Sequence, residues 1–300
     1  NYQSWKEIAN WYQEIAAPSL VSNDSIHQLV SRLLSPHPGM KGFEKAQLLY
    51  RWLEKNLNYS SQAFRQDNYV PQPANKVFED RLGDCKDLSA LYIVLCREAG
   101  LKAHFCLVNM DSRAGTNKQY PNINFNHCIV RVYADGHPYF VELTSRNLPF
   151  ACNLNYAVFG YGLEIDSTDM HPSPVRIWNE GKSDYVHLAS EIRHEENGRI
   201  TMKGRLAILG MTTSVLRDAF EKIDSAQIQT AIQKLLADLI PNTAIEKAGL
   251  LAKTEQQDTL WITFEATCPD IFIDVADLYI YKFPVFMKRI IDEALFANPN

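Results

Sequence analysis

Cys85 is the first residue whose type and position could support covalent chemistry. It follows Asp84 and opens an apolar stripe that stops at Gly100, so Asp84 is the predicted N-cap and Cys85 the first helical residue. Unpaired backbone N–H groups and the helix dipole lower the pKa of a thiol at that position. Asp84 and Asp87 oppose this effect, because carboxylates raise a thiol pKa unless a stronger cation counters them. A cysteine that opens a helix is by itself more often a small buried residue, so a nucleophile there needs a partner base.

A β-hairpin downstream of this helix supplies a candidate base. Asp135-Gly136 is a strong signal for a two-residue turn within the strand-like segment 125–144. The turn places Val130 opposite Val141 and gives a continuous apolar face, and a one-residue slip would scramble that face. The register of the hairpin is therefore predicted from the sequence.

The opposite face of the hairpin carries the polar side chains. His127 is predicted opposite Thr144 and diagonal to Glu142, close enough for the carboxylate to orient the imidazole. An imidazole held in this way can take the proton of a nucleophile. The sequence predicts Cys85 as nucleophile, His127 as base and Glu142 as the orienting acid.

The elements that must position these residues follow from the periodicity of the first half of the chain. Apolar residues at helical spacing predict three helices before the cysteine, and the segment 59–80 loses all periodicity and is predicted to be a long loop. The predicted elements are helices over 5–15, 26–33, 43–53 and 85–99, a strand over 101–109, a polar loop over 111–124 and the hairpin.

The second half of the chain predicts a separate unit. Its composition shifts to Ser, Thr, Asp, Pro and Gly around 166–184. We predict an α+β protein with a first domain over 1–170, a linker over 171–184 and a β-rich accessory domain over 185–300 that carries no catalytic constellation. The accessory domain is predicted to contain strands over 185–193, 199–209, 244–253 and 259–267 and helices over 213–223 and 226–240.

Composition excludes several classes of protein. Thirty Lys and Arg against thirty-five Asp and Glu give a net charge of −5, and the basic residues form no stripe, so we expect no nucleic-acid partner. The longest uncharged apolar run, 206–216, is too short for a transmembrane segment. The six cysteines contain no Cys-x-x-Cys pair, which argues against structural zinc. A metal site of His127, Cys128 and Cys106 is disfavoured, because strand alternation places the side chains of Cys128 and His127 on opposite faces of the sheet. We expect neither metal nor cofactor.

The start of the chain raises an expectation about its origin. It opens at Asn1 without Met or a signal-peptide pattern. We expect the sequence to be part of a longer precursor, with the accessory domain incomplete at its C-terminus.

Four segments together resemble the bacterial transglutaminase-like superfamily, in the branch flanked by β-rich domains of unknown function. They are Gly83-Asp-Cys-Lys-Asp87, Tyr69-Val-Pro-Gln-Pro-Ala-Asn-Lys-Val77, Asn126-His-Cys-Ile-Val130 and Tyr139-Phe-Val-Glu-Leu-Thr-Ser145. The resemblance spans roughly 1–165 and implies a papain-like α+β core, a preceding β-rich domain, a signal peptide and a periplasmic or cell-envelope location. It also implies Cys85 as nucleophile, His127 as base and position 142 as the third member, where the family usually has Asp.

An acyl-transfer site also needs donors for the oxyanion. The backbone N–H of Cys85 is one natural donor. The second is expected from a side chain of the irregular loop, with Tyr59, Gln62 and Gln72 as candidates.

Two functions are compatible with these residues. The first is a thiol-dependent enzyme that acts on a peptide or protein amide through an acyl-enzyme, with hydrolysis favoured over transfer to an amine. The second is a non-catalytic peptide-binding or scaffold protein of the bacterial envelope. The sequence shows neither the substrate nor the acceptor.

Overall fold

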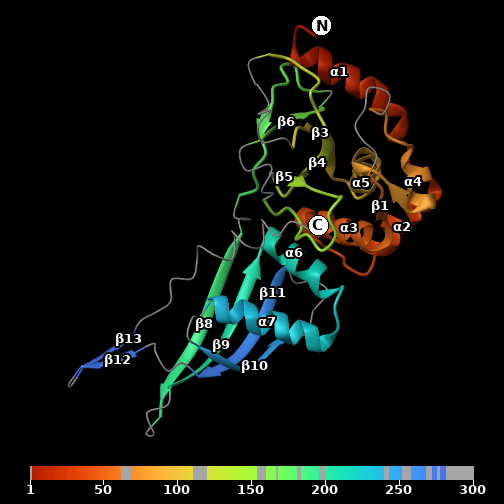
Figure 1. Cartoon of the computed structure of the whole chain (residues 1–300). Helices are drawn as coiled ribbons and strands as arrows, with labels where there is room; N and C mark the ends of the chain where they lie inside the picture. The colour runs from red at the N-terminus through yellow and green to blue at the C-terminus, as the bar shows by residue number, and fades with distance from the viewer. Residues whose placement is uncertain are drawn as a thin grey trace. The chain divides into compact units, whose positions relative to one another are not determined.

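The computed structural model describes the chain as two units. The description covers 2–61, 69–110, 120–153, 160–166, 168–180, 184–195, 200–239, 243–251 and 258–267, with the backbone of 272–275 and 278–281. The first unit is Asn1–Ser183 and the second is Asp184–Asn300 (Figure 1).

The three helices predicted at the start of the first unit are confirmed. Each apolar stripe packs into the core, and Ile8 and Tyr12 on the first helix and Leu49 on the third have no exposed surface. Ser4 caps the first helix and Asn23 the second through their side-chain oxygens, which accept backbone N–H groups. The helices are α1 (Trp5–Ala16), α2 (Asp24–Leu34) and α3 (Gly42–Asn56), with a short 3₁₀ turn η1 (Ala17–Ser19) after α1.

The prediction of an irregular loop over 59–80 was wrong at its C-terminal end. Ala74–Asp80 form helix α4, which follows Pro73 and buries Ala74 and Val77 completely. Seven residues span only about two turns, too few for a helical period to be recognised in the sequence. A second regular feature precedes the loop, where β1 (Asn58–Tyr59) pairs in parallel with β2 (Leu82–Gly83).

The helix predicted after Asp84 is confirmed as α5 (Cys85–Glu98). All residues from Cys85 to Cys96 are buried, and Gly100 has the positive φ of 77° that favours glycine after a helix C-terminus. Helix α5 packs against β3 and β4, as Figure 1 shows. It is therefore the central helix of the first unit, with its N-terminus beside the sheet.

The sheet of the first unit is five-stranded and antiparallel, with strand order β5-β4-β3-β6-β7. The predicted strand and hairpin are confirmed, whereas β6 and β7 were not predicted from the sequence. The strands are β3 (Lys102–Val108), β4 (His127–Ala134), β5 (His137–Val141), β6 (Tyr161–Glu164) and β7 (Val175–Arg176).

The turn of the hairpin is tied to helix α3. Asp135 and Gly136 both have positive φ, 51° and 82°, as a two-residue hairpin turn requires. The Asp135 carboxylate accepts hydrogen bonds from the backbone N–H groups of Gly42 and Phe43, both 2.9 Å. These bonds lower the pKa of Asp135. One acid thus shapes the turn and caps a helix.

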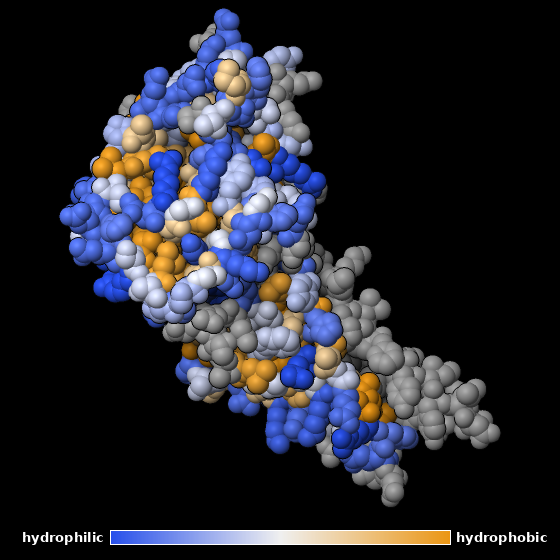
Figure 2. All heavy atoms as spheres, turned by 180° about the vertical axis from the view of Figure 1, so that it is seen from behind, coloured by the Kyte–Doolittle hydropathy of each residue, from blue (hydrophilic) through white to orange (hydrophobic). Residues whose placement is uncertain are grey.

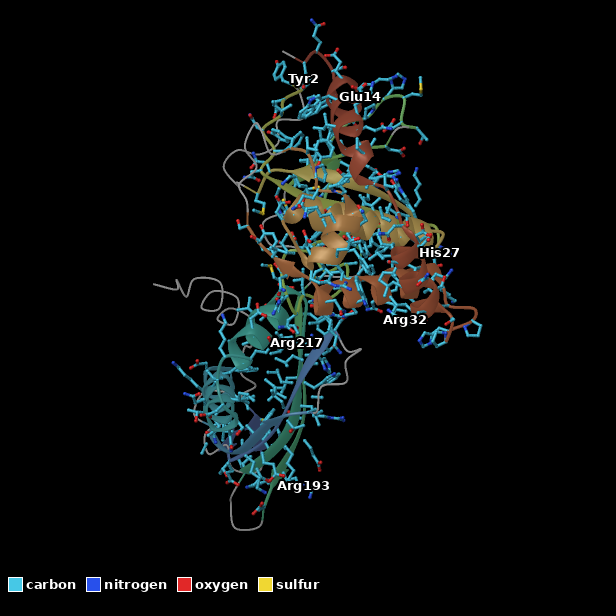
Figure 3. The ribbon with its side chains drawn as sticks, turned by 90° about the vertical axis from the view of Figure 1, so that its right-hand side faces the viewer. Tyr2, Glu14, His27, Arg32, Arg193 and Arg217 are labelled. Atoms are coloured by element: carbon cyan, nitrogen blue, oxygen red, sulfur yellow. The ribbon has the colours of Figure 1, made fainter. Side chains whose placement is uncertain are left out.

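The second unit has the predicted alternation of strands and helices. Two helices pack on one side of a four-stranded antiparallel sheet with order β10-β11-β9-β8. Arg193 lies near the end of β8, and Arg217 lies on α6 (Figure 3). The elements are β8 (Tyr185–His194), β9 (Ile200–Leu209), α6 (Met211–Phe220), α7 (Ser225–Leu239), β10 (Ala244–Leu250) and β11 (Thr259–Thr267), with a separate pair β12 (Phe272–Val275) and β13 (Leu278–Tyr281). The chain has the predicted α+β class, with a second β-rich region.

The surface mixes polar and apolar side chains. Figure 2 shows short hydrophobic patches separated by hydrophilic side chains on one face of the molecule. Among the helices of the described segments, none is long and apolar enough to cross a membrane.

Truncation of Leu91 tests the importance of α5 for the core. Leu91 has no exposed surface, so Leu91→Ala is expected to lower the free energy of unfolding by about 2–5 kcal/mol through lost burial and a cavity. Urea titration followed by tryptophan fluorescence measures the loss. Leu82→Ala is the matched control, because Leu82 is 47% exposed. An equal effect of the two substitutions would contradict this account of the core.

Candidate active site

The N-terminus of α5 is held by a reciprocal pair of carboxylates. Asp84 accepts hydrogen bonds from the backbone N–H groups of Lys86 (3.1 Å) and Asp87 (3.2 Å), and Asp87 accepts the N–H of Asp84 (3.1 Å). This capping box confirms Asp84 as the N-cap. Cys85 is the first helical residue, at the positive end of the helix dipole, and it is 3% exposed.

His127 and Glu142 are in direct contact in the structure. The Nε2 atom of His127 and Oε2 of Glu142 are 2.8 Å apart, and both side chains are buried. His127 is the first residue of β4, and Glu142 directly follows β5. The hairpin therefore brings together the two residues that the sequence predicted as a pair.

The prediction that Thr144 lies opposite His127 in the ladder was wrong. The predicted register holds up to Val130 opposite Val141, where the β4–β5 pairing ends. Beyond it the chain turns, and Oε1 of Glu142 accepts hydrogen bonds from Leu143 N (2.9 Å), Thr144 N (2.8 Å) and Thr144 Oγ1 (2.7 Å). The carboxylate satisfies these backbone groups in place of the ladder, and it is thereby fixed against His127.

Cys85 completes this group. The thiol hydrogen-bonds the imidazole of His127. Because Nε2 faces Glu142, this leaves Nδ1 as the ring atom available to Cys85. The structure thus links Cys85, His127 and Glu142 in one line of contacts.

The charge state of His127 follows from its neighbours. Burial alone would lower the pKa of His127, but the negative charge of Glu142 and the hydrogen bonds to Cys85 and Glu142 raise it to about 10. The imidazole therefore carries its proton at neutral pH. A protonated ring beside a thiol is suited to stabilise a thiolate and to deliver a proton to a leaving group.

The three candidate oxyanion donors have different surroundings. Tyr59 is 41% exposed, and β1 places it next to Gly83, two residues before Cys85. Burial raises the pKa of Tyr59, with further contributions from the charges of Cys85 and Glu142. Gln72 uses its side-chain amide and backbone N–H to bind Asp87, at 3.0 and 2.8 Å. Gln62 lies outside the described residues.

Gln72 therefore supports the cap, and Tyr59 is the candidate whose strand lies next to Gly83. Sequence reasoning missed this role of Gln72, although the carboxylate of Asp87 needs donors once it is buried. Sequence reasoning also missed the side chain of Lys86, which is buried against Asp84. Two acids beside a candidate thiolate require a nearby cation, and this requirement is the sequence signal that points to Lys86.

One group of described residues has donor atoms near enough to share a metal ion. His104, Glu164 and Asp166 have their donor atoms within 4.8 Å of one another. Glu164 is already bound to His104 and Arg131, and Asp166 to Lys102. The cations satisfy both carboxylates, so this group forms an ion-pair network on the sheet.

One family model matches the part of the chain that carries Cys85 and His127. Residues 28–141 match the model of the transglutaminase-like superfamily. The chain contains a transglutaminase-like domain. The match spans α5 with Cys85 and β4 with His127 and ends one residue before Glu142. The resemblance inferred from the motifs is thereby confirmed for this domain.

Two solved structures are similar to this chain. One is described as a putative cysteine protease from Cytophaga hutchinsonii, with 19% identity, a TM-score of 0.31, and coverage of 43% of this chain and 41% of that chain. The other is described as a putative protease from Parabacteroides distasonis ATCC 8503, with 9% identity, a TM-score of 0.45, and coverage of 89% and 53%. The chain thus spans about half or less of both proteins. No curated protein gives a significant match.

Neutralising Glu142 tests the charge state of His127 in the transglutaminase-like domain. Glu142→Gln removes the charge that opposes the effect of burial on the pKa of His127. The midpoint of the His127 titration, followed by NMR of ¹⁵N-labelled imidazoles, is expected to fall from about 10 by about 1–3 pH units. The ring then loses its proton at a lower pH.

Glu164→Gln is the matched control for this titration. It removes a carboxylate bound to His104 and Arg131 and is expected to leave the His127 midpoint in place. An unchanged midpoint in Glu142→Gln would show that the charge of Glu142 does not hold the proton on His127.

Proposed function

We propose that this protein is a thiol-dependent enzyme that cleaves amide bonds of peptide or protein substrates through an acyl-enzyme on Cys85. The observation that carries the proposal is the line of contacts from Cys85 through His127 to Glu142. Membership of residues 28–141 in the transglutaminase-like superfamily supports a cysteine-type hydrolase or acyltransferase at the level of the superfamily.

The first half of the proposed reaction forms the acyl-enzyme. His127 holds the proton of Cys85, and the sulfur attacks the carbonyl carbon of the amide to form a C–S bond. The C–N bond then breaks, and the leaving nitrogen takes the proton from His127. Glu142 keeps the ring oriented and stabilises its positive charge in the ground state.

The second half releases the acyl group. The neutral imidazole of His127 takes a proton from water, the resulting hydroxide oxygen bonds to the carbonyl carbon, and the C–S bond breaks. An amine in place of water would give acyl transfer by the same steps. We favour hydrolysis, because water needs no second binding site.

The oxyanion needs two donors in this mechanism. Cys85 supplies its backbone N–H, which has no partner within the helix because Cys85 is its first residue. We assign the second donor to the hydroxyl of Tyr59, whose strand pairs with Gly83 beside the nucleophile. This donor stabilises charge that develops only in the transition state.

The low exposure of the site favours one other function. Cys85 and His127 are each 3% exposed, so substrate must displace surrounding groups to reach the sulfur. A site that stays closed would make the domain a non-catalytic peptide-binding or scaffold module. Turnover and thiol labelling distinguish the two functions.

The cell-envelope location implied by the family resemblance is also part of the proposal. Fractionation of cells that express the full-length protein tests it, with the protein expected in the periplasmic or envelope fraction. Recovery in the cytosolic fraction would contradict it.

Replacement of the nucleophile is the main test of function. Cys85→Ala is expected to lower the release of amine from a panel of peptide and peptidoglycan-derived amides by at least about 10³-fold, because no acyl-enzyme can form. Added hydroxylamine or an amine acceptor separates transfer from hydrolysis through the products detected by mass spectrometry. Iodoacetamide should label Cys85 faster than the other cysteines near neutral pH.

Cys96→Ala provides the matched control on the same helix. Cys96 is fully buried, and burial raises its pKa to about 12, so its loss should leave turnover and Cys85 labelling intact. No turnover of any substrate, together with Cys85 labelling no faster than a free thiol, would favour the non-catalytic function.

Tyr59→Phe tests the second oxyanion donor. Loss of the hydroxyl is expected to lower kcat by about 100-fold with little change in KM, because the bond forms to the transition state. Tyr185→Phe, on an exposed tyrosine of the second unit, is the control. A kcat equal to that of the wild type would remove Tyr59 from the mechanism.

A further inference from the structure

Three charged side chains are buried at the N-terminus of α5, next to Cys85. Asp84, Lys86 and Asp87 are 3%, 4% and 3% exposed. Charged residues are rarely buried to this extent unless they are paired. Each of the three must therefore satisfy its charge inside the protein.

The two carboxylates both bind backbone N–H groups. Asp87 binds Asp84 N, Gln72 N and Gln72 Nε2. One oxygen of Asp84 binds the N–H groups of Lys86 and Asp87, and its other oxygen binds the ammonium of Lys86. The capping box requires both acids, and both acids place negative charge beside the nucleophile.

Among the described residues, few of the groups that face Cys85 from other elements are cations. His127 comes from β4 and Glu142 from the end of β5. Cys128 on β4, Tyr12 on α1 and Tyr59 on β1 also interact with Cys85. Burial raises the pKa of all three of these groups, so they are neutral near pH 7.

The charge balance around the sulfur consequently depends on Lys86. Among the described residues named above, three carboxylates (Asp84, Asp87 and Glu142) stand against two cations (Lys86 and His127). His127 is already shared between Cys85 and Glu142. Lys86 is the cation bound to the cap of the nucleophile helix.

We propose that Lys86 is a positioning residue of this site, whose ammonium neutralises Asp84 so that the helix can be capped without opposing a thiolate at Cys85. The inference rests on the proposed thiol chemistry and extends it to a residue that does not touch the reacting atoms. Lys86 acts through Asp84, its hydrogen-bonded partner.

The burial of the Lys86–Asp84 pair makes this effect large. Their side chains are 5% and 2% exposed, compared with 55% and 48% for the Lys76–Asp80 pair on α4. Exposed pairs are screened by solvent and contribute little, whereas a buried carboxylate that loses its partner keeps most of its field. Burial also raises the pKa of Asp84, and the bond to Lys86 opposes that rise. Lys86 thus counteracts the effect of burial on the Asp84 carboxylate.

The test is the pH dependence of Cys85 alkylation in the full chain. Iodoacetamide reacts with the thiolate, and mass spectrometry of the Cys85 peptide gives the rate at each pH. Lys86→Met is expected to raise the midpoint of the alkylation profile by about 1 pH unit, because an uncompensated carboxylate disfavours the thiolate. Lys86→Arg keeps the charge and should keep a midpoint near that of the wild type.

A second pair of variants isolates the role of Asp84. The substitution Asp84→Asn keeps a side-chain oxygen that can cap the helix but removes the negative charge. The double variant Asp84→Asn, Lys86→Met should therefore return the midpoint toward the wild-type value, and Asp84→Asn alone should lower it. These two variants leave no unpaired buried carboxylate at position 84, so they decide the question even if Lys86→Met does not fold.

Lys76→Met is the matched control, since it removes an exposed lysine from an Asp pair and should leave the profile unchanged. A folded Lys86→Met with the wild-type midpoint, or an Asp84→Asn with no lower midpoint, would overturn the role of Lys86. A wild-type Cys85 midpoint of about 8.5, the value of a free cysteine, would instead overturn the proposed function itself.

Discussion

The burial of α5 is the constraint on which the first unit depends. A helix that is covered from Cys85 to Cys96 cannot leave the N–H groups of its first turn to water, so the protein must satisfy them. Asp84 accepts the N–H groups of Lys86 and Asp87, and Asp87 accepts that of Asp84. The two buried acids in turn bind Gln72 and Lys86. The position of the candidate nucleophile is one result of this chain of requirements.

Glu142 shows how the site accommodates an acid that is one methylene longer than the aspartate usual in the transglutaminase-like superfamily. One oxygen of Glu142 turns back onto the N–H groups of the two residues that follow it, and the other reaches His127. The longer side chain thus serves the backbone where the β-ladder ends. Its second oxygen still meets the imidazole at an ordinary hydrogen-bond distance.

Local signals in the sequence predicted much of this arrangement. The N-cap at Asp84, the two-residue turn at Asp135-Gly136 and the pairing of Val130 with Val141 each follow from neighbouring residues, and all are confirmed. Helix α4 is too short to show its period. The ladder ends after Val141 because the Glu142 side chain accepts the backbone N–H groups of Leu143 and Thr144. Strand alternation alone does not reveal that competition.

The tie between Asp135 and the start of α3 has a mechanical consequence. His127 and Glu142 stand at the open end of a hairpin whose closed end is bonded to a helix, so imidazole and carboxylate move together as parts of one hydrogen-bonded body. The sulfur belongs to another body, the buried helix. Any loosening between sheet and helix stretches the sulfur–imidazole contact while the imidazole–carboxylate contact persists. The reactivity of the Cys85 thiol therefore depends on how closely α5 packs against the sheet.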